Sequence, residues 1–83
     1  MTPGSDVSIA AAKLADRPYR KVIRGNDVDG FLAEAPELPG CVTAGESVQE
    51  ALEMLQDAME GWIEAALAAG EHIPEPEAAR LSA

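Results

Sequence analysis

The residues best suited to chemistry lie at 26–30, NDVDG, where two carboxylates at alternate positions precede a glycine. Calcium loops begin in this way, with oxygen ligands at alternate positions and a glycine at the sixth. If Asp29 and Gly30 are the fifth and sixth loop residues, Gly25 is the first and Pro36 the twelfth, where carboxylates are needed. The match fails. The segment is instead typical of a tight turn, because Asn, Asp and Gly tolerate left-handed dihedral angles.

The chain contains one cysteine, Cys41, and one histidine, His72. A nucleophilic cysteine needs a neighbour that lowers its pKa, and the sequence places none close to Cys41, so we interpret it as a small buried apolar residue. One histidine and one distant cysteine can neither build a zinc site nor complete a catalytic triad. A lone cysteine also excludes an internal disulfide and favours a reducing, cytoplasmic location. We therefore expect no enzyme, no cofactor and no metal.

Charge is unevenly distributed along the 83 residues. Fifteen Asp and Glu against six Lys and Arg give a formal net charge of −9. Five of the six basic residues lie within residues 13–24, and no Lys or Arg occurs between Arg24 and Arg80. An acidic surface of this kind repels a nucleic-acid backbone and attracts a basic protein. The alternative is that the negative charge only keeps a small protein soluble.

Turn and helix signals predict one small α+β domain without a membrane span. They indicate a short N-terminal helix that ends before Pro18, a hairpin around residues 25–30, a rigid corner at 36–40 (PELPG) and one long helix. The sheet should be antiparallel, with three strands and a fourth as the alternative, and should pack against the long helix. The expected elements are a helix at 5–16, strands at 19–24, 31–35 and 41–44, and a helix between Ser47 and Gly70. The expected division is an N-terminal extension at 1–17, a domain at 18–74 and an extended tail at 75–83.

The long helix carries the clearest signals. Ser47 and Glu50 form the S-x-x-E pattern of a capping box, and Gly70 is placed to end the helix. Apolar residues recur between them at intervals of four and three, which lays one stripe along the helix. The stripe consists of Val48, Leu52, Leu55, Met59, Trp62 and Ala66. The residues expected in the core or at an oligomer interface are Tyr19, Phe31, Leu52, Leu55, Met59 and Trp62. Because much of the apolar content is alanine, the core should be thin, and we expect a homo-oligomer, either a dimer or a tetramer.

A second stripe on the same helix is acidic. It consists of Glu46, Glu50, Glu53, Asp57, Glu60 and Glu64, again at intervals of four and three. Neighbouring carboxylates on a helix repel, and no Lys or Arg of this helix relieves them. The stripe is therefore either a solvated face, a surface that docks a cationic partner, or the contact for the basic residues 13–24 of a neighbouring subunit.

Three motifs make the segment from about Tyr19 to Pro76 resemble the HicB-like antitoxin family. They are PELPGC at 36–41, GES at the start of the long helix, and the helix EALEMLQDAMEGWIEA that is followed by GEHIP. The resemblance implies a partial ribonuclease-H-like fold without that fold's catalytic carboxylates. It also implies a protein that binds and neutralises a small basic HicA-type toxin, which cleaves mRNA. Complete members usually also carry a C-terminal DNA-binding segment, so we do not expect DNA binding from a chain that ends at Ala83.

We therefore expect an antitoxin-like module that masks the surface of a basic toxin. The acids expected at its interface are, around the hairpin and the corner, Asp27, Asp29, Glu34 and Glu37 and, along the helix, Glu53, Asp57 and Glu60. Charge reversal at Glu34 and Glu37 is expected to weaken capture more than reversal at Glu75 and Glu77.

Three alternatives remain open on the sequence. The first is a nucleic-acid-binding or transcriptional accessory that uses the basic residues 13–24. The second is a ribonuclease-H-type enzyme that uses Asp27, Asp29 and Glu34 with a divalent metal. The third is an orphan homo-oligomer without a toxin partner.

Overall fold

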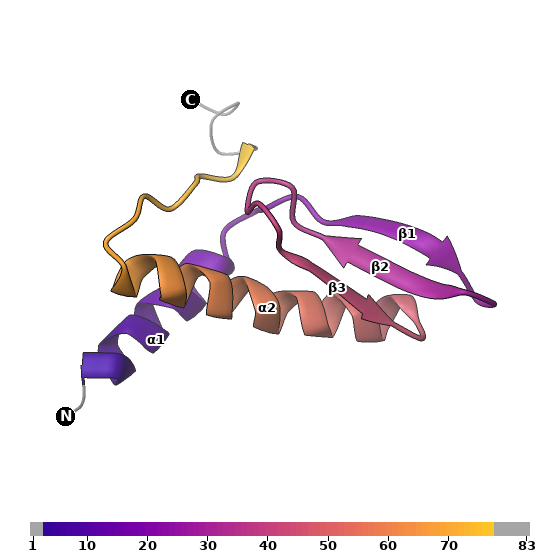
Figure 1. The fold of residues 1–83 in the computed structure, drawn as a ribbon, viewed down its shortest axis with the longest axis horizontal. Helices are drawn as coiled ribbons and strands as arrows, with labels where there is room; N and C mark the ends of the chain where they lie inside the picture. Colours follow the sequence, from indigo (N-terminus) through magenta and orange to yellow (C-terminus); the bar gives the residue numbers. More distant parts are fainter. Residues whose placement is uncertain (1–2, 78–83) are drawn as a thin grey trace.

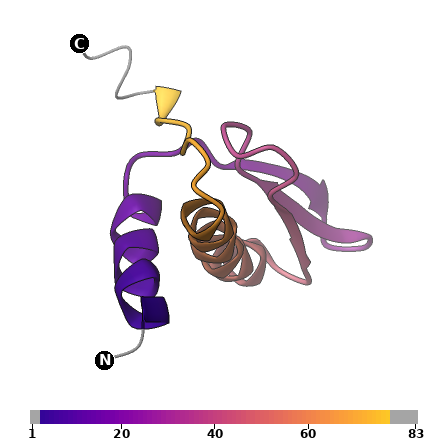
Figure 2. The ribbon, with the colours of Figure 1, turned by 60° about the vertical axis from the view of Figure 1, so that its left-hand side comes forward.

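The computed structural model describes residues 3–77 and the side chains of residues 7–77. They form two helices and a three-stranded antiparallel sheet of order β1-β2-β3. The elements are α1 (Pro3–Ala15), β1 (Val22–Asn26), β2 (Gly30–Glu34), β3 (Val42–Gly45) and α2 (Val48–Ala68). One face of the sheet packs against α2 (Figure 1), and α2 lies between the sheet and α1 (Figure 2). The predicted α+β arrangement is confirmed. Residues 1–2 of the expected extension and 78–83 of the expected tail lie outside the described residues.

Several predicted element boundaries differ from the observed ones, and the starts of the first helix and the first strand show why. The first helix begins at Pro3 instead of residue 5, because proline suits the first helical position, where its missing N–H is not needed. The first strand begins at Val22 instead of residue 19. The backbone N–H of Tyr19 bonds to the carbonyl of Arg17 at 2.7 Å, and that of Arg20 bonds to the side chain of Glu37. These bonds hold the chain in a turn, so neither residue can join the sheet.

The ends of α2 are formed by the residues that the sequence predicts. Ser47 is the N-cap, and its Oγ accepts the N–H of Glu50 at 3.0 Å. The Glu50 carboxylate reaches back to the N–H of Glu46 at 2.9 Å, one residue beyond the usual capping box. At the other end Gly70 has φ 72° and the N–H of Glu71 bonds to the carbonyl of Ala66 at 2.8 Å, which is the Schellman pattern.

The buried side of α2 is broader than the predicted stripe. Its buried residues are Ala51, Leu55, Met59, Ile63 and Ala66. Ile63 is fully buried although the stripe omits it, whereas Val48, which the stripe includes, is 41% exposed. The reason is that α2 contacts both the sheet and α1, so a wider arc of its surface is covered. Trp62 packs partly against the core, and its Nε1–H donates to the carbonyl of Pro39 in the corner at 2.9 Å.

The sheet turns one face toward α2 and leaves the other open. On the covered face Ile23 and Ala33 pack into the core, and the Thr43 hydroxyl donates to the carbonyl of Ala51 at 2.9 Å. Because side chains alternate along each strand, the residues between these point the other way. We call this open side the outer sheet face; it consists of Val22, Arg24, Leu32, Glu34, Val42 and Ala44.

Gly45 and Gly61 should respond in opposite ways to substitution by alanine. A Cβ at Gly45 would lie 2.6 Å from the backbone N of Ala51, so the free energy of unfolding of Gly45→Ala should fall by about 1–3 kcal/mol. A Cβ at Gly61 would have no atom within 4 Å, so Gly61→Ala should raise the free energy of unfolding by about 0.5–1 kcal/mol. Urea denaturation measures both changes. A destabilised Gly61→Ala would contradict this prediction and indicate that another backbone approaches α2 there.

Candidate protein-docking surface

The tip of the β1–β2 hairpin is held by the side chain of one residue, Asn26. Its Oδ1 accepts the backbone N–H groups of Val28 at 2.9 Å and Asp29 at 2.8 Å, and its Nδ2 donates to Oδ2 of Asp29 at 3.1 Å. These bonds use the Asn side chain as a substitute for backbone turn bonds. The tip is therefore a fixed structure that can present its charged side chains in a defined geometry.

Three carboxylates gather around this tip. A shallow hollow of about 360 Å³ is lined by Asp27, Asp29 and Glu46, together with Val28 and Gly30. Glu46 reaches this place because the register pairs Phe31 with Gly45, so β3 ends beside the start of β2. Among the described residues, no Lys or Arg forms an ion pair with any of the three. We call Asp27, Asp29 and Glu46 the hairpin-tip acids.

The acids of α2 form a second negative surface, along the helix. Glu53 and Asp57 are exposed and Glu60 is half-buried. Glu53 accepts a hydrogen bond from Gln49 at 3.0 Å, and no ion pair in the described part of the chain neutralises any of these three. The stripe thus keeps its charge within one subunit and remains available to a cation from outside.

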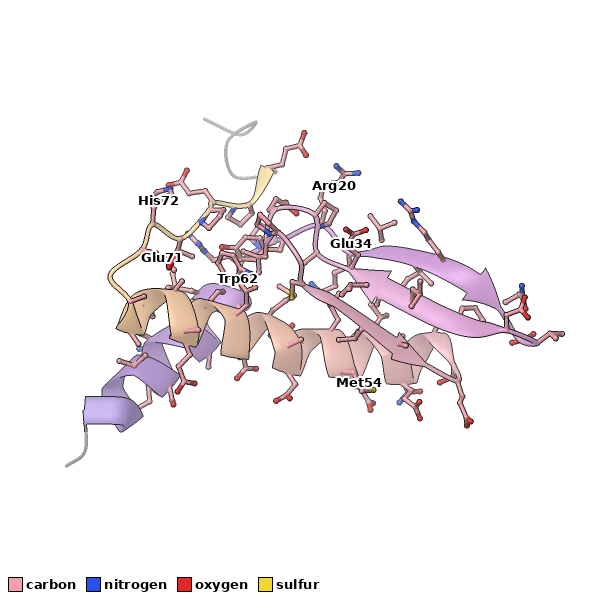
Figure 3. The ribbon with its side chains drawn as sticks, viewed as in Figure 1. Arg20, Glu34, Met54, Trp62, Glu71 and His72 are labelled. Atoms are coloured by element: carbon pink, nitrogen blue, oxygen red, sulfur yellow. The ribbon has the colours of Figure 1, made fainter. Side chains whose placement is uncertain are left out.

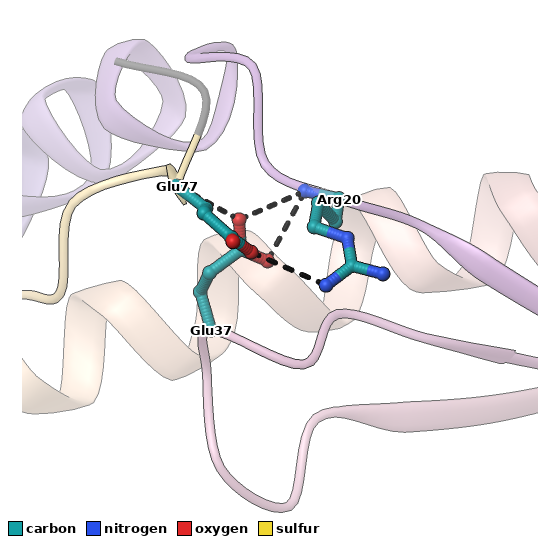
Figure 4. A network of polar contacts seen from close by, with 3 residues as sticks. All are labelled: Arg20, Glu37 and Glu77. Carbon is teal, nitrogen blue, oxygen red and sulfur yellow. Dashed lines mark hydrogen bonds and ion pairs between the residues drawn. The ribbon is translucent and has the colours of Figure 1, made fainter. Parts of the chain in front are cut away.

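Glu34 and Glu37 lie apart from the hairpin-tip acids and in different surroundings. Glu34 is half-buried on the outer sheet face, where the register sets it between Val22 and Val42 (Figure 3). Glu37 lies in the corner, and its two oxygens accept the backbone N–H of Arg20 at 3.1 and 3.2 Å and that of Glu77 at 3.0 Å (Figure 4). Glu37 therefore joins three chain segments that are distant in sequence.

A second set of contacts fixes the same region. Arg20 pairs with Glu77 at 3.2 Å, and the Tyr19 hydroxyl donates to the carbonyl of Pro74. Arg17 donates to the same carbonyl at 3.2 Å and lies 5.2 Å from the centroid of the Tyr19 ring. The basic segment 13–24 is therefore divided, because Arg17 and Arg20 hold the segment after α2 while Arg24 lies on the outer sheet face.

The ionisation of Glu37 should make the fold acid-sensitive. Partial burial by itself would raise the pKa of Glu37, but the N–H groups of Glu77, Arg20 and Glu37 itself, together with the charge of Arg20, lower that pKa below its ordinary value of 4.5. A carboxyl whose pKa is lower in the folded state stabilises the fold above its unfolded pKa. This stabilisation is lost as the pH falls through the folded pKa.

We expect Glu37→Gln to lower the free energy of unfolding by about 1–2 kcal/mol at neutral pH, because the amide has one acceptor oxygen and loses the charge. The difference from the wild type should shrink as the pH falls below 4.5. Urea denaturation from neutral pH to below 4.5 measures the difference in the free energy of unfolding, with Glu71→Gln at an exposed position as the control. A difference that does not change with pH would mean that the charge of Glu37 is not what holds the segments together.

Nucleophilic and metal-binding groups are not assembled in the described chain. Cys41 is 4% exposed, and burial raises the pKa of its thiol, as expected of a small core residue. His72 is exposed after the end of α2. Within residues 3–77 no three of the His, Cys, Asp and Glu side chains are placed to share a metal ion. No helix of these residues is long and apolar enough to cross a bilayer.

The acids predicted at the interface thus occupy separate surfaces. Asp27 and Asp29 share the tip, Glu34 lies on the outer sheet face, Glu37 is bonded internally, and Glu53, Asp57 and Glu60 follow α2. Five of the six residues expected to pack belong to the core or lie against it: Tyr19, Leu55 and Met59 are buried, and Phe31 and Trp62 pack partly against them. Leu52 is partly buried but does not pack against the core cluster. Sequence reasoning did not place Glu46 at the tip, since only the strand register brings it there. It also missed Val28, an apolar residue that is 91% exposed between two of these acids.

Comparison with known proteins places the chain in a family. A UPF0150 protein of Synechocystis is 41% identical over 49 residues, which cover 59% of this chain and 67% of that protein. A UPF0150 protein of Thermoplasma acidophilum is 36% identical over 62 residues, which cover 74% of this chain and 90% of that protein. No solved structure matches the chain at a comparable level. Residues 19–82 match the family described as the HicB-like antitoxin of the bacterial toxin–antitoxin system. The chain therefore belongs to the HicB-like antitoxin family.

Proposed function

We propose that this chain neutralises a small basic HicA-type toxin, an RNA-cleaving protein, by binding to it and covering its cationic surface. The observation that carries the proposal is the gathering of Asp27, Asp29 and Glu46 around one hollow without a cation paired to them in the described chain. A partner that cleaves RNA must attract phosphates, so its surface is complementary to these carboxylates. The chain itself acts by binding and needs no catalytic residue.

The hairpin tip supplies two kinds of contact for such a partner. The hairpin-tip acids attract the toxin from a distance, which speeds encounter and selects a basic protein. Val28, 91% exposed between Asp27 and Asp29, offers an apolar side chain that becomes buried once the surfaces meet. The acids of α2 offer a second negative surface. The toxin would thus meet the tip first and α2 second.

The proposal includes the setting in which the chain works. It acts in the cytoplasm, where the RNA cleaved by its partner is found, and a single free cysteine, Cys41, suits that reducing compartment. It acts as a homo-oligomer, since an 83-residue chain buries a thin core by itself.

Affinity capture of the tagged chain from the lysate of its host, followed by mass spectrometry, tests the proposal. We expect a small basic protein in near-equal amount, released by high salt and able to cleave RNA after release. Recovery of the chain alone, at low salt and with its partner gene expressed, would contradict the proposal. Nucleic acid recovered in place of a basic protein would favour the accessory alternative.

A further inference from the structure

β3 forms an edge of the sheet, and among the described residues no strand pairs with its outer side. The N–H of Ala35 donates to the carbonyl of Cys41 at 3.0 Å. Bonded positions alternate along an antiparallel strand, so Thr43, two residues after Cys41, also bonds to β2. The N–H and C=O groups of Val42 and Ala44 point outward, and within residues 3–77 no turn, loop or cap hydrogen bond uses them.

The two open edges of the sheet differ in how they are guarded. Monomeric proteins protect edge strands with charged residues, prolines or distortions that block pairing. β1 has two of these protections. Lys21 precedes it and Arg24 lies within it, so the edge carries charge, and Gly25, with φ 120°, distorts the strand. β3, with the sequence VTAG, contains no charge and no proline, and its Val42 is 51% exposed. Only β3 is therefore suited to pair with a further strand.

We propose that two copies of this chain pair through β3 across a two-fold axis and so join their sheets into one. Outward groups must meet outward groups. A two-fold axis at Thr43 uses the outward groups of both Val42 and Ala44, and it sets Val42 opposite Ala44 of the second copy and Thr43 opposite its own counterpart. Each pair of Val42 and Ala44 then exchanges two hydrogen bonds. The proposal names the surface of the homo-oligomer included in the proposed function, and it does not depend on the toxin.

Charge selects a second copy as the occupant of this edge. Two chains that each carry a net charge of −9 repel, so a contact between them is favoured where neither presents acids. β3 meets this condition, and Val42 and Ala44 add apolar contact on the outer sheet face. A strongly cationic partner gains nothing from an uncharged strand. The Thr43 side chains of the two copies would lie opposite each other, a favourable cross-strand pair.

The register makes a charge test possible. V42K/A44K would place two lysines opposite each other at both pairs, whereas V42K/A44E would place a lysine opposite a glutamate. L32K is the matched control, because Leu32 lies on the same face and is 49% exposed but lies on the central strand. The wild type and these three variants are compared as purified chains by sedimentation over a dilution series. Amide exchange is followed at Val42 and Ala44 of the wild type.

The wild type should sediment as two chains of 8.7 kDa, with the amides of Val42 and Ala44 protected more strongly as concentration rises. V42K/A44K should raise the dimer Kd by about tenfold or more, while V42K/A44E and L32K should retain the dimer. A wild type that stays monomeric, with exchange independent of concentration, would overturn the proposal. A dimer lost in L32K but kept in V42K/A44K would also overturn it and indicate packing through the outer sheet faces. Because no toxin is present, failure of toxin capture leaves each of these results unchanged.

Discussion

Reversing two carboxylates at the hairpin tip, with D27K/E46K, should weaken binding of the basic partner by about 30-fold or more at low salt. Each reversal turns an attraction of about 1 kcal/mol, at about 4 Å in water, into a repulsion of similar size. Neither side chain makes a hydrogen bond in the described chain, so the turn held by Asn26 stays intact. Asp29 is left unchanged because it bonds to Asn26. Titration calorimetry at several salt concentrations measures the loss of affinity, which should become smaller as salt screens the charges.

The matched control for this loss is E71K/E75K. It changes the net charge by the same amount, and Glu71 lies beyond the end of α2 that is remote from the hairpin (Figure 3). The binding of this variant should weaken much less. Equal losses would mean that only the total charge of the chain matters, which would contradict a site at the tip. Glu37 and Glu77 are unsuitable for this comparison, because both hold the fold together through Arg20.

Ile63→Ala should strongly destabilise the core around α2. Ile63 is 0% exposed, and removing most of a buried isoleucine side chain costs about 2–5 kcal/mol, partly through the cavity left behind. The total stability of a small domain is about 5–15 kcal/mol, so this loss would remove a large share of the free energy of unfolding. Urea denaturation, followed by the tryptophan fluorescence of Trp62, measures the change in the free energy of unfolding.

Val48→Ala is the control for Ile63→Ala, since both shorten a β-branched residue of α2. Val48 is 41% exposed at the first position of α2, and we expect a change of less than about 0.5 kcal/mol. A larger loss from Val48→Ala than from Ile63→Ala would mean that α2 is rotated toward the stripe that the sequence suggests. That outcome would contradict the arrangement of the core described above.

Local chemistry explains why the ends of α2 could be predicted. Ser47 caps the helix with its own hydroxyl, and Gly70 adopts the left-handed conformation that other residues avoid. The buried side of α2 depends instead on where α1 arrives, and that contact joins residues far apart in the chain. Predicting the buried side from apolar residues at intervals of three and four assumes that the helix packs against one surface. With two partners, Ile63 becomes buried and Val48 does not.

The candidate site shows the same limit. The sequence contains carboxylates at Asp27, Glu37 and Glu46, and composition gives no reason to treat them differently. In the folded chain Glu37 accepts three hydrogen bonds from two backbone N–H groups, whereas Asp27 and Glu46 face one hollow at the tip. Only the strand register and the path of the segment after α2 separate a carboxylate that stabilises the fold from one that can meet a partner.

Titrating the chain into the RNA-cleavage reaction of its captured basic partner is a direct test of toxin neutralisation. Wild-type chain should stop cleavage at near-equal amounts, and at least about 30-fold more of D27K/E46K should be needed at low salt. E71K/E75K should inhibit almost as well as the wild type. Cleavage that continues unchanged in the presence of excess wild-type chain would contradict neutralisation by masking.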